Sequence, residues 1–169
     1  MSLSDYLLQE LRRSAETVPR FARGAMQPIW CVRSRRALIV LDASAVVDLL
    51  LERGERGAWV ERRLVREDVV AAPHLIDLEV ASAIRRRELA GELGSARGRA
   101  SLGDFAMMPL RRYPATALLD RIWQLRPNLT AYDAAYVALA EALEAPLVTM
   151  DGGIGRSVGH GAKIEAFPG

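Results

Sequence analysis

The sequence contains little cysteine and histidine, and these shortages exclude several kinds of protein. Among its 169 residues Cys31 is the only cysteine, so no disulfide can form within the chain. This cysteine usage suits a reducing compartment. His74 and His160 are the only histidines, and no His/Cys constellation provides the ligands of a zinc site.

Long apolar runs are also missing. No apolar stretch approaches the roughly 20 residues that a membrane-spanning helix needs. The first ten residues, MSLSDYLLQE, carry two acids and lack the apolar core of a secretory signal. We therefore expect a cytoplasmic protein without a membrane partner. Half of the residues are nevertheless apolar, which is sufficient for one globular domain with its own core.

The charge is distributed unevenly along the chain. Residues 1–36 contain seven arginines and three acids, whereas the remainder contains 16 basic and 18 acidic residues. An acidic domain is a poor match for a nucleic acid, which attracts basic surfaces. If several of these acids hold divalent cations, however, the rest of the surface is slightly basic.

Short apolar runs alternate with helical patterns from residue 37 onwards. The pattern predicts strands at 37–41, 69–72 (stopped by Pro73), 110–113, 147–150 and 163–167. It predicts helices at 43–52, 75–89, 115–126 and 130–144, with a turn and a shorter helix around Gly91, Gly94 and Gly98. This alternation indicates an α/β fold with a parallel sheet covered by helices on both faces. Ligands in such folds bind beyond the carboxyl ends of the strands.

Four acids occupy strand ends and helix starts in this plan. Asp42 directly follows the first strand, and Asp151 directly follows the strand at 147–150. Glu79 and Asp133 lie in the first turns of two helices. Clustered carboxylates repel one another unless cations intervene, and hard oxygen ligands suit Mg²⁺ or Mn²⁺. Two such ions about 4 Å apart would stabilise both the attacking and the leaving oxygen of a phosphodiester.

Each acid also has a purely structural interpretation. Asp133 and Thr130 are spaced as a helix-capping pair. Asp151 precedes two glycines, as turn residues do, and Glu79 could be a surface residue of its helix. Ser44 could cap the helix that follows Asp42. Asp42 itself is harder to explain structurally, because it ends an apolar strand with a charge. The joint placement of the acids therefore carries the functional hypothesis.

Four segments carry a resemblance to a known family: IVLDASAVV around Asp42, HLIDLEVASAIRR around Glu79, LTAYDAAYVALAEAL around Asp133, and APLVTMD ending at Asp151. In their order and spacing they resemble a PIN domain, in particular the VapC toxins of bacterial toxin–antitoxin pairs. The resemblance implies a three-layer α/β/α sandwich with a five-stranded parallel sheet. It also implies an endoribonuclease that uses Mg²⁺ or Mn²⁺, a cognate antitoxin and a homodimer.

The motif match assigns roles to individual residues. It places the four acids at the catalytic and metal-binding positions, and Ser44 and Thr149 at those of supporting hydroxyls. The chain departs from the family after Asp151, where Gly152-Gly153-Ile154-Gly155 replaces the more usual basic and apolar helix start.

Two further features suggest contacts with partners. Arg85, Arg86, Arg87, Arg111 and Arg112 are candidates for gripping the RNA backbone, although the first three could be a solvated helix end. Residues 1–36 precede the domain at 37–169 and begin with an amphipathic helical pattern over 2–15. This pattern resembles the carboxyl half of ribbon-helix-helix antitoxins. It could be an antitoxin remnant joined by a linker or a plain extension.

Two other functional classes share part of this pattern. A haloacid-dehalogenase-like hydrolase needs a second aspartate two residues after the first, and Ser44 occupies that position here. A catalytically silent PIN fold that binds RNA or protein is the main alternative. Cleavage of DNA also stays open, since a site that reads phosphate does not itself sense the 2′-hydroxyl.

Overall fold

A five-stranded parallel sheet forms the centre of the computed structural model, which describes residues 38–52 and 54–168. The strands are β1 (Leu38–Leu41), β2 (Val69–Pro73), β3 (Leu110–Tyr113), β4 (Leu147–Thr149) and β5 (Ile164–Ala166). Their order across the sheet is β3-β2-β1-β4-β5, and every neighbouring pair is parallel. The expected α/β sandwich is confirmed.

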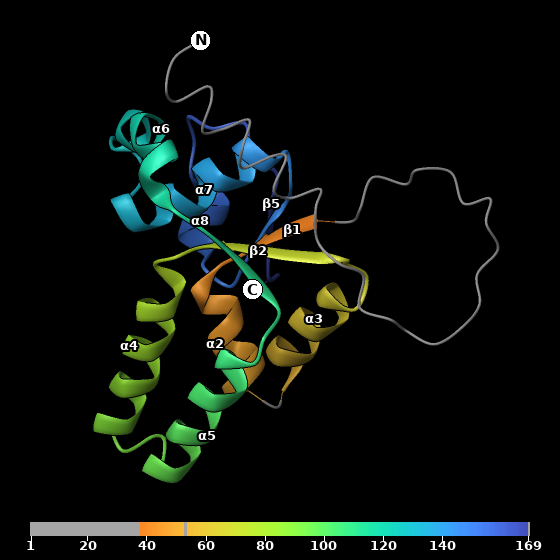
Figure 1. Ribbon diagram of the computed structural model, residues 1–169, viewed down its shortest axis with the longest axis vertical. Helices are drawn as coiled ribbons and strands as arrows, with labels where there is room; N and C mark the ends of the chain where they lie inside the picture. Colours follow the sequence, from red (N-terminus) through yellow and green to blue (C-terminus); the bar gives the residue numbers. More distant parts are fainter. Residues whose placement is uncertain (1–37, 53, 169) are drawn as a thin grey trace, which may run out of the picture.

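Helices cover the sheet on both sides. They are α2 (Ala43–Leu51), α3 (Glu55–Leu64), α4 (Ile76–Leu89), α5 (Ser95–Ala106), the 3-10 turn η1 (Ala115–Leu118), α6 (Leu119–Leu125), α7 (Ala131–Leu143) and α8 (Gly152–Arg156). Figure 1 shows α6 and α7 on one side of the strands and α2 to α5 on the other. Ile39, Val40 and Leu41 of β1 are fully buried, because the central strand is covered on both faces.

The helix α3 was not predicted from the sequence. Its residues include Gly57, and glycine lowers helix propensity. A Cβ at this glycine would lie 2.1 Å from the carbonyl oxygen of Glu52, so the close approach of α2 and α3 requires it. The ring of Trp59 packs edge-on against Phe167, with centroids 5.7 Å apart. Tertiary packing therefore stabilises a helix with a weak local signal.

Three other boundaries differ from the expectation. Gly98 lies inside α5 and does not interrupt this helix, and the segment at 115–126 begins as a 3-10 turn. The strand β2 runs through Pro73, which lies beyond the last residue paired with β1, so its missing N–H costs no ladder bond to β1. A short helix, α8, forms at the glycine-rich departure after Asp151, anchored by the buried Ile154.

The expectations for residues 1–36 lie outside the described residues. Within residues 38–52 and 54–168, no helix has both the length and the apolar character needed to cross a membrane.

Candidate active site

The sheet reverses its winding direction between β1 and β4, and Asp42 lies at this point. From β1 the chain moves to β2 on one side, and β4 lies on the other side. Asp42 directly follows β1, and its backbone N–H donates to the carbonyl of Val148 in β4 at 3.0 Å. Crevices at such switch points are where α/β folds bind ligands. The predicted position of Asp42 at a ligand crevice therefore agrees with the topology.

Two hydroxyl groups fix the carboxylate of Asp42. Its Oδ2 accepts hydrogen bonds from Ser44 Oγ at 2.5 Å and from Thr149 Oγ1 at 2.7 Å. Ser44 Oγ in turn accepts from the backbone N–H of Met150, and Thr149 Oγ1 accepts from that of Asp151, both at 3.0 Å. The structure thus brings together Asp42, Ser44 and Thr149, as the motif match implied.

The interpretation of Ser44 as a helix cap is wrong. The start of α2 has no side-chain cap, although Asp42 occupies the capping position. Ser44 instead joins this start to the segment that follows β4, because its hydroxyl bonds both Asp42 and the Met150 backbone. Asp42 is only 6% exposed, and its carboxylate does not cap α2 as the carboxylates of surface aspartates normally do at helix starts.

Burial and like charge shape the protonation of the acids. Burial raises the pKa of Asp42, the hydroxyls of Ser44 and Thr149 oppose this shift, and the charge of Asp133 adds to it. Burial also raises the pKa of Glu79, and the charges of Asp42 and Asp133 act in the same direction. Three of the four predicted acids therefore lie within one another's electrostatic field.

Tyr136 is a site residue that the sequence interpretation missed. Its hydroxyl donates to Glu79 Oε2 at 2.5 Å, and its side chain is 1% exposed. Burial raises the pKa of Tyr136, and its hydrogen bond to Glu79 raises it further, so the hydroxyl stays protonated as a donor. One signal was available: Tyr136 follows Asp133 by three residues, which places both on one side of α7.

Asp133 and Asp151 also take part in hydrogen bonds at helix starts. Thr130 Oγ1 donates to Asp133 Oδ2 at 2.7 Å and accepts from the Asp133 backbone N–H at 3.2 Å. The expected pairing of these two residues is therefore confirmed, but Thr130 is the residue that caps α7. Asp151 is exposed, and its Oδ1 accepts from the backbone N–H of Gly153 at 2.6 Å at the start of α8. Both acids therefore have local partners.

The acids are near one another without converging on a point. In the part of the chain that the structure describes, no group of three or more Asp, Glu, His or Cys side chains is arranged to hold a metal ion. Their chemistry nevertheless fits a hard divalent cation, because carboxylate oxygens raised in pKa by burial and mutual repulsion gain from a positive charge.

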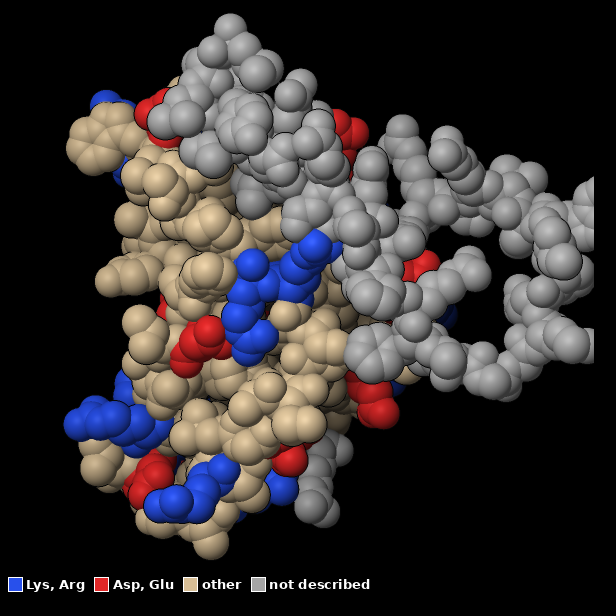
Figure 2. Space-filling model, in the orientation of Figure 1, with Lys and Arg blue, Asp and Glu red and all other residues tan. Residues whose placement is uncertain are grey.

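The five candidate arginines occupy different environments. Arg85 and Arg86 are exposed on α4, and the charge of Arg86 lowers the pKa of Glu79. Arg87 bonds Glu52 at 2.7 Å, Arg112 pairs with Asp77 at 2.8 Å, and the guanidinium of Arg111 lies over the ring of Tyr113. Figure 2 shows basic side chains over α4 and α5 interspersed with acidic ones rather than forming a continuous strip. Arg85 and Arg86 are therefore the better placed for an external partner.

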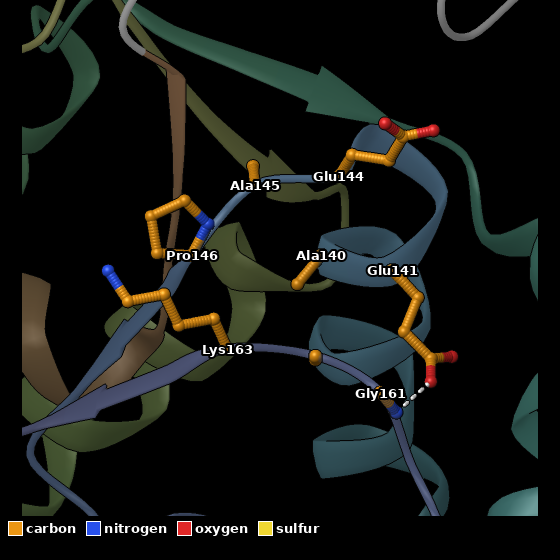
Figure 3. A pocket seen from close by; sticks show the side chains of 8 residues that line it. Ala140, Glu141, Glu144, Ala145, Pro146, Gly161 and Lys163 are labelled. Atoms are coloured by element: carbon orange, nitrogen blue, oxygen red, sulfur yellow. Dashed lines mark hydrogen bonds between the residues drawn. The ribbon is translucent and has the colours of Figure 1, made fainter.

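A pocket of about 490 Å³ lies away from these acids. Its lining comes from the end of α7 and from the residues just before β4 and β5, including Glu141, Pro146 and Lys163 (Figure 3). Glu141 Oε1 accepts there from the backbone N–H of Gly161 at 2.7 Å. Because the strands are parallel, their amino ends lie at the opposite edge from Asp42. This pocket is therefore separate from the candidate active site.

Known proteins share both the sequence pattern and the fold. The PIN domain family model matches residues 39–157. Ribonuclease VapC9 of Mycobacterium tuberculosis is 46% identical over 114 residues, which cover 68% of this chain and 86% of that protein. Ribonuclease VapC12 of the same species is 44% identical over 128 residues, or 76% of this chain and 98% of that protein.

Solved structures agree on the fold. VapBC2 from Rickettsia felis, solved bound to a DNA fragment from its promoter, includes a chain with a TM-score of 0.59 at 14% identity. That match covers 78% of this chain and 99% of the other. VapC20 of Mycobacterium tuberculosis, described as a Sarcin-Ricin loop cleaving toxin, has a TM-score of 0.55 at 18% identity and covers 69% of this chain and 92% of its own.

Proposed function

We infer that this chain, which belongs to the PIN-domain family and resembles its VapC ribonucleases over most of its length, is an endoribonuclease and the toxin of a toxin–antitoxin pair. The observation that carries this conclusion is the buried carboxylate of Asp42 at the switch point of the sheet, held by Ser44 and Thr149. A carboxylate buried without a cationic partner costs stability, so its presence there calls for a functional reason.

We propose that Mg²⁺ or Mn²⁺ is the cofactor. Asp42, Glu79 and Asp133 would hold it, with Asp151 as a further ligand from the start of α8. Their hard oxygens and the raised pKa values of Asp42 and Glu79 support this assignment. When bound, the cation would neutralise charge developing on the phosphate and lower the pKa of an attacking water.

The chain's own residues have distinct tasks in this proposal. Ser44 and Thr149 orient Asp42, and the hydroxyl of Tyr136 orients Glu79 by occupying one of its oxygens. Such supporting hydrogen bonds typically change metal affinity or activity about 10- to 100-fold when they are removed. Asp133 lies at the start of the 13-residue helix α7, where the dipole favours the phosphate of a substrate.

We further propose a cognate antitoxin and a homodimer as partners. The similarity to VapC ribonucleases over most of the chain supports the antitoxin. The RNA substrate is proposed on the same basis, together with the exposed arginines of α4.

The proposed activity can be tested by sequencing RNA 5′ ends after induced expression of the full chain and of Asp42→Asn. New ends at discrete internal positions are expected with the wild-type chain and not with the variant. The absence of new ends with the wild-type chain would contradict the proposal and favour a catalytically silent binding module. The purified wild-type and Asp42→Asn proteins should give matching circular dichroism spectra of a folded protein, so that misfolding of the variant does not explain a difference in RNA ends.

A further inference from the structure

Two large aromatic side chains on either side of the connection between α6 and α7 are unusually exposed. Trp123 on α6 is 68% exposed, and Tyr132 in the first turn of α7 is 63% exposed. Tryptophan is highly buried on average in folded proteins. Trp59, by contrast, packs against Phe167. Trp123 and Tyr132 therefore lie on the surface without the packing that normally explains such residues.

Arg126 holds the ring of Trp123 from one side. Its guanidinium carbon lies 4.7 Å from the ring centroid, and its Nη1 donates to the carbonyl oxygen of Trp123 at 2.8 Å. Leu125, between them in sequence, is 1% exposed and fixes the end of α6 in the core. Asn128 Nδ2 donates to the carbonyl of Val158 at 3.0 Å and fastens the connection that follows. The structure thus combines an exposed indole and a cation on a fixed support.

The helix α6 directly precedes the helix that carries Asp133. The helix α6 ends at Leu125 and α7 begins at Ala131, so the last turn of α6 and the first turn of α7 are neighbours along a short connection. Figure 1 shows α6 and α7 packed on the same side of the sheet. Tyr132 directly precedes Asp133, whose charge acts on Asp42. Tyr132 therefore lies beside one of the acids, and Trp123 and Arg126 lie across a short connection from it.

We propose that Trp123, Arg126 and Tyr132 form a stacking surface for unpaired bases of the RNA next to the cleaved phosphate. This rests on the proposed function and specifies its substrate as a single-stranded or looped segment. Unpaired bases can stack on exposed rings and on guanidinium groups, whereas bases in a duplex are already stacked. Arg126 adds a positive charge for the phosphate backbone. The position of Tyr132 next to Asp133 favours RNA over a second copy of the chain.

The test measures binding of a fluorescently labelled ten-nucleotide oligoadenylate by anisotropy. All proteins are full-length and carry Asp42→Asn to prevent cleavage, with Mg²⁺ present and salt at about 0.3 M to weaken contacts made only to phosphate. Replacing a stacking ring by alanine costs about 1–3 kcal/mol per base, which corresponds to a roughly 5- to 150-fold loss of affinity. We expect Trp123→Ala to weaken binding at least about fivefold, and Trp123→Phe to retain most of it.

Leu119→Ala is the matched control, because Leu119 is 56% exposed one turn earlier on α6 and has no ring. Its affinity should equal that of the parent, and a ten-base-pair RNA duplex should bind equally to all variants. Equal affinity of Trp123→Ala and the parent for the oligoadenylate would overturn the proposal. So would a halved molar mass of Trp123→Ala in light scattering with unchanged RNA affinity, which would assign the surface to a second copy.

Failure of the proposed ribonuclease activity would be seen separately. In that case the chain with an intact Asp42 would leave RNA uncut, while the binding differences among the variants at Trp123 would persist. Melting temperatures close to that of the parent would show that each variant is folded.

Discussion

Replacing Asp42 by asparagine should abolish cleavage and at the same time stabilise the metal-free protein. The carboxylate is buried, and burial together with the charge of Asp133 raises its pKa. A raised pKa means that the folded state binds the proton more tightly than the unfolded state does. Stability from this group is therefore present at low pH and is lost as the pH rises through the folded pKa. Asparagine removes that loss, because it stays neutral.

The magnitude follows from linkage. Each unit of pKa shift corresponds to about 1.4 kcal/mol, and about 1 kcal/mol changes the Tm of a protein of this size by roughly 2–4 °C. A rise of about 2 °C or more at pH 8 in EDTA, shrinking towards pH 4, is the expected signature. Cleavage should fall by more than tenfold, since changes to supporting residues alone cost about 10- to 100-fold.

Asp48→Asn is the matched control, because Asp48 is also a buried aspartate of α2 but is ion-paired. Its carboxylate bonds Arg56 at 2.6 Å and lies 3.8 Å from Arg87. Neutralising it leaves two arginines without this partner, so its Tm should fall while cleavage is retained. Thermal melts in EDTA at pH 4 to 8 and a cleavage assay measure both effects. If Asp42→Asn lowered the Tm as Asp48→Asn does, the argument from burial would be refuted.

Three further predictions concern the cation, Tyr136 and the arginines. Mn²⁺ at about 100 times its dissociation constant should stabilise the fold by about 2.7 kcal/mol in thermal melts. At a fixed Mn²⁺ concentration the stabilisation should be larger at pH 8 than at pH 5, because protons compete for carboxylates whose pKa is raised. An equal shift in the Asp42→Ala, Asp133→Ala double variant would place the ion elsewhere. Tyr136→Phe should weaken Mn²⁺ binding about 10-fold or more, because Glu79 loses its hydrogen-bond donor. Thermal melts over a range of Mn²⁺ concentrations measure this affinity, and an unchanged affinity would make Tyr136 a packing residue only. The double variant Arg85→Gln, Arg86→Gln neutralises two exposed arginines of α4. It should reduce the slope of log affinity for single-stranded RNA against log salt by about 1.4, whereas an unchanged slope would show that these arginines are surface charge only.

The central part of the fold and site could be predicted because its signals are local. Residues 37–41 are continuously apolar, which is typical of a strand covered on both faces, and β1 has this environment. Asp42 stood out because a charge ends that strand without a turn residue. The pairing of Thr130 with Asp133 was also readable, since a capping pair lies within three residues.

Other features depend on contacts between distant parts of the chain. Tyr136 acts on Glu79, which is 57 residues away, and no local pattern reports that α7 and α4 meet there. Arg112, a candidate RNA contact, forms an ion pair with Asp77, which is 35 residues away, and no local pattern predicts this pair. The helix α3 was missed for a similar reason, because its stability comes from packing rather than from propensity.

The most direct test of the central claim is cleavage of RNA by the purified full chain with its cations controlled. The protein is treated with EDTA, divided, and supplied with Mg²⁺, Mn²⁺ or buffer, and each portion receives RNA or DNA of the same sequence. The proposal predicts internal cuts in the RNA with Mg²⁺ or Mn²⁺, none in EDTA, and none from Asp42→Asn under any condition. Cleavage that proceeds equally in EDTA, or that survives in the folded Asp42→Asn variant, would contradict a metal-dependent ribonuclease built around Asp42.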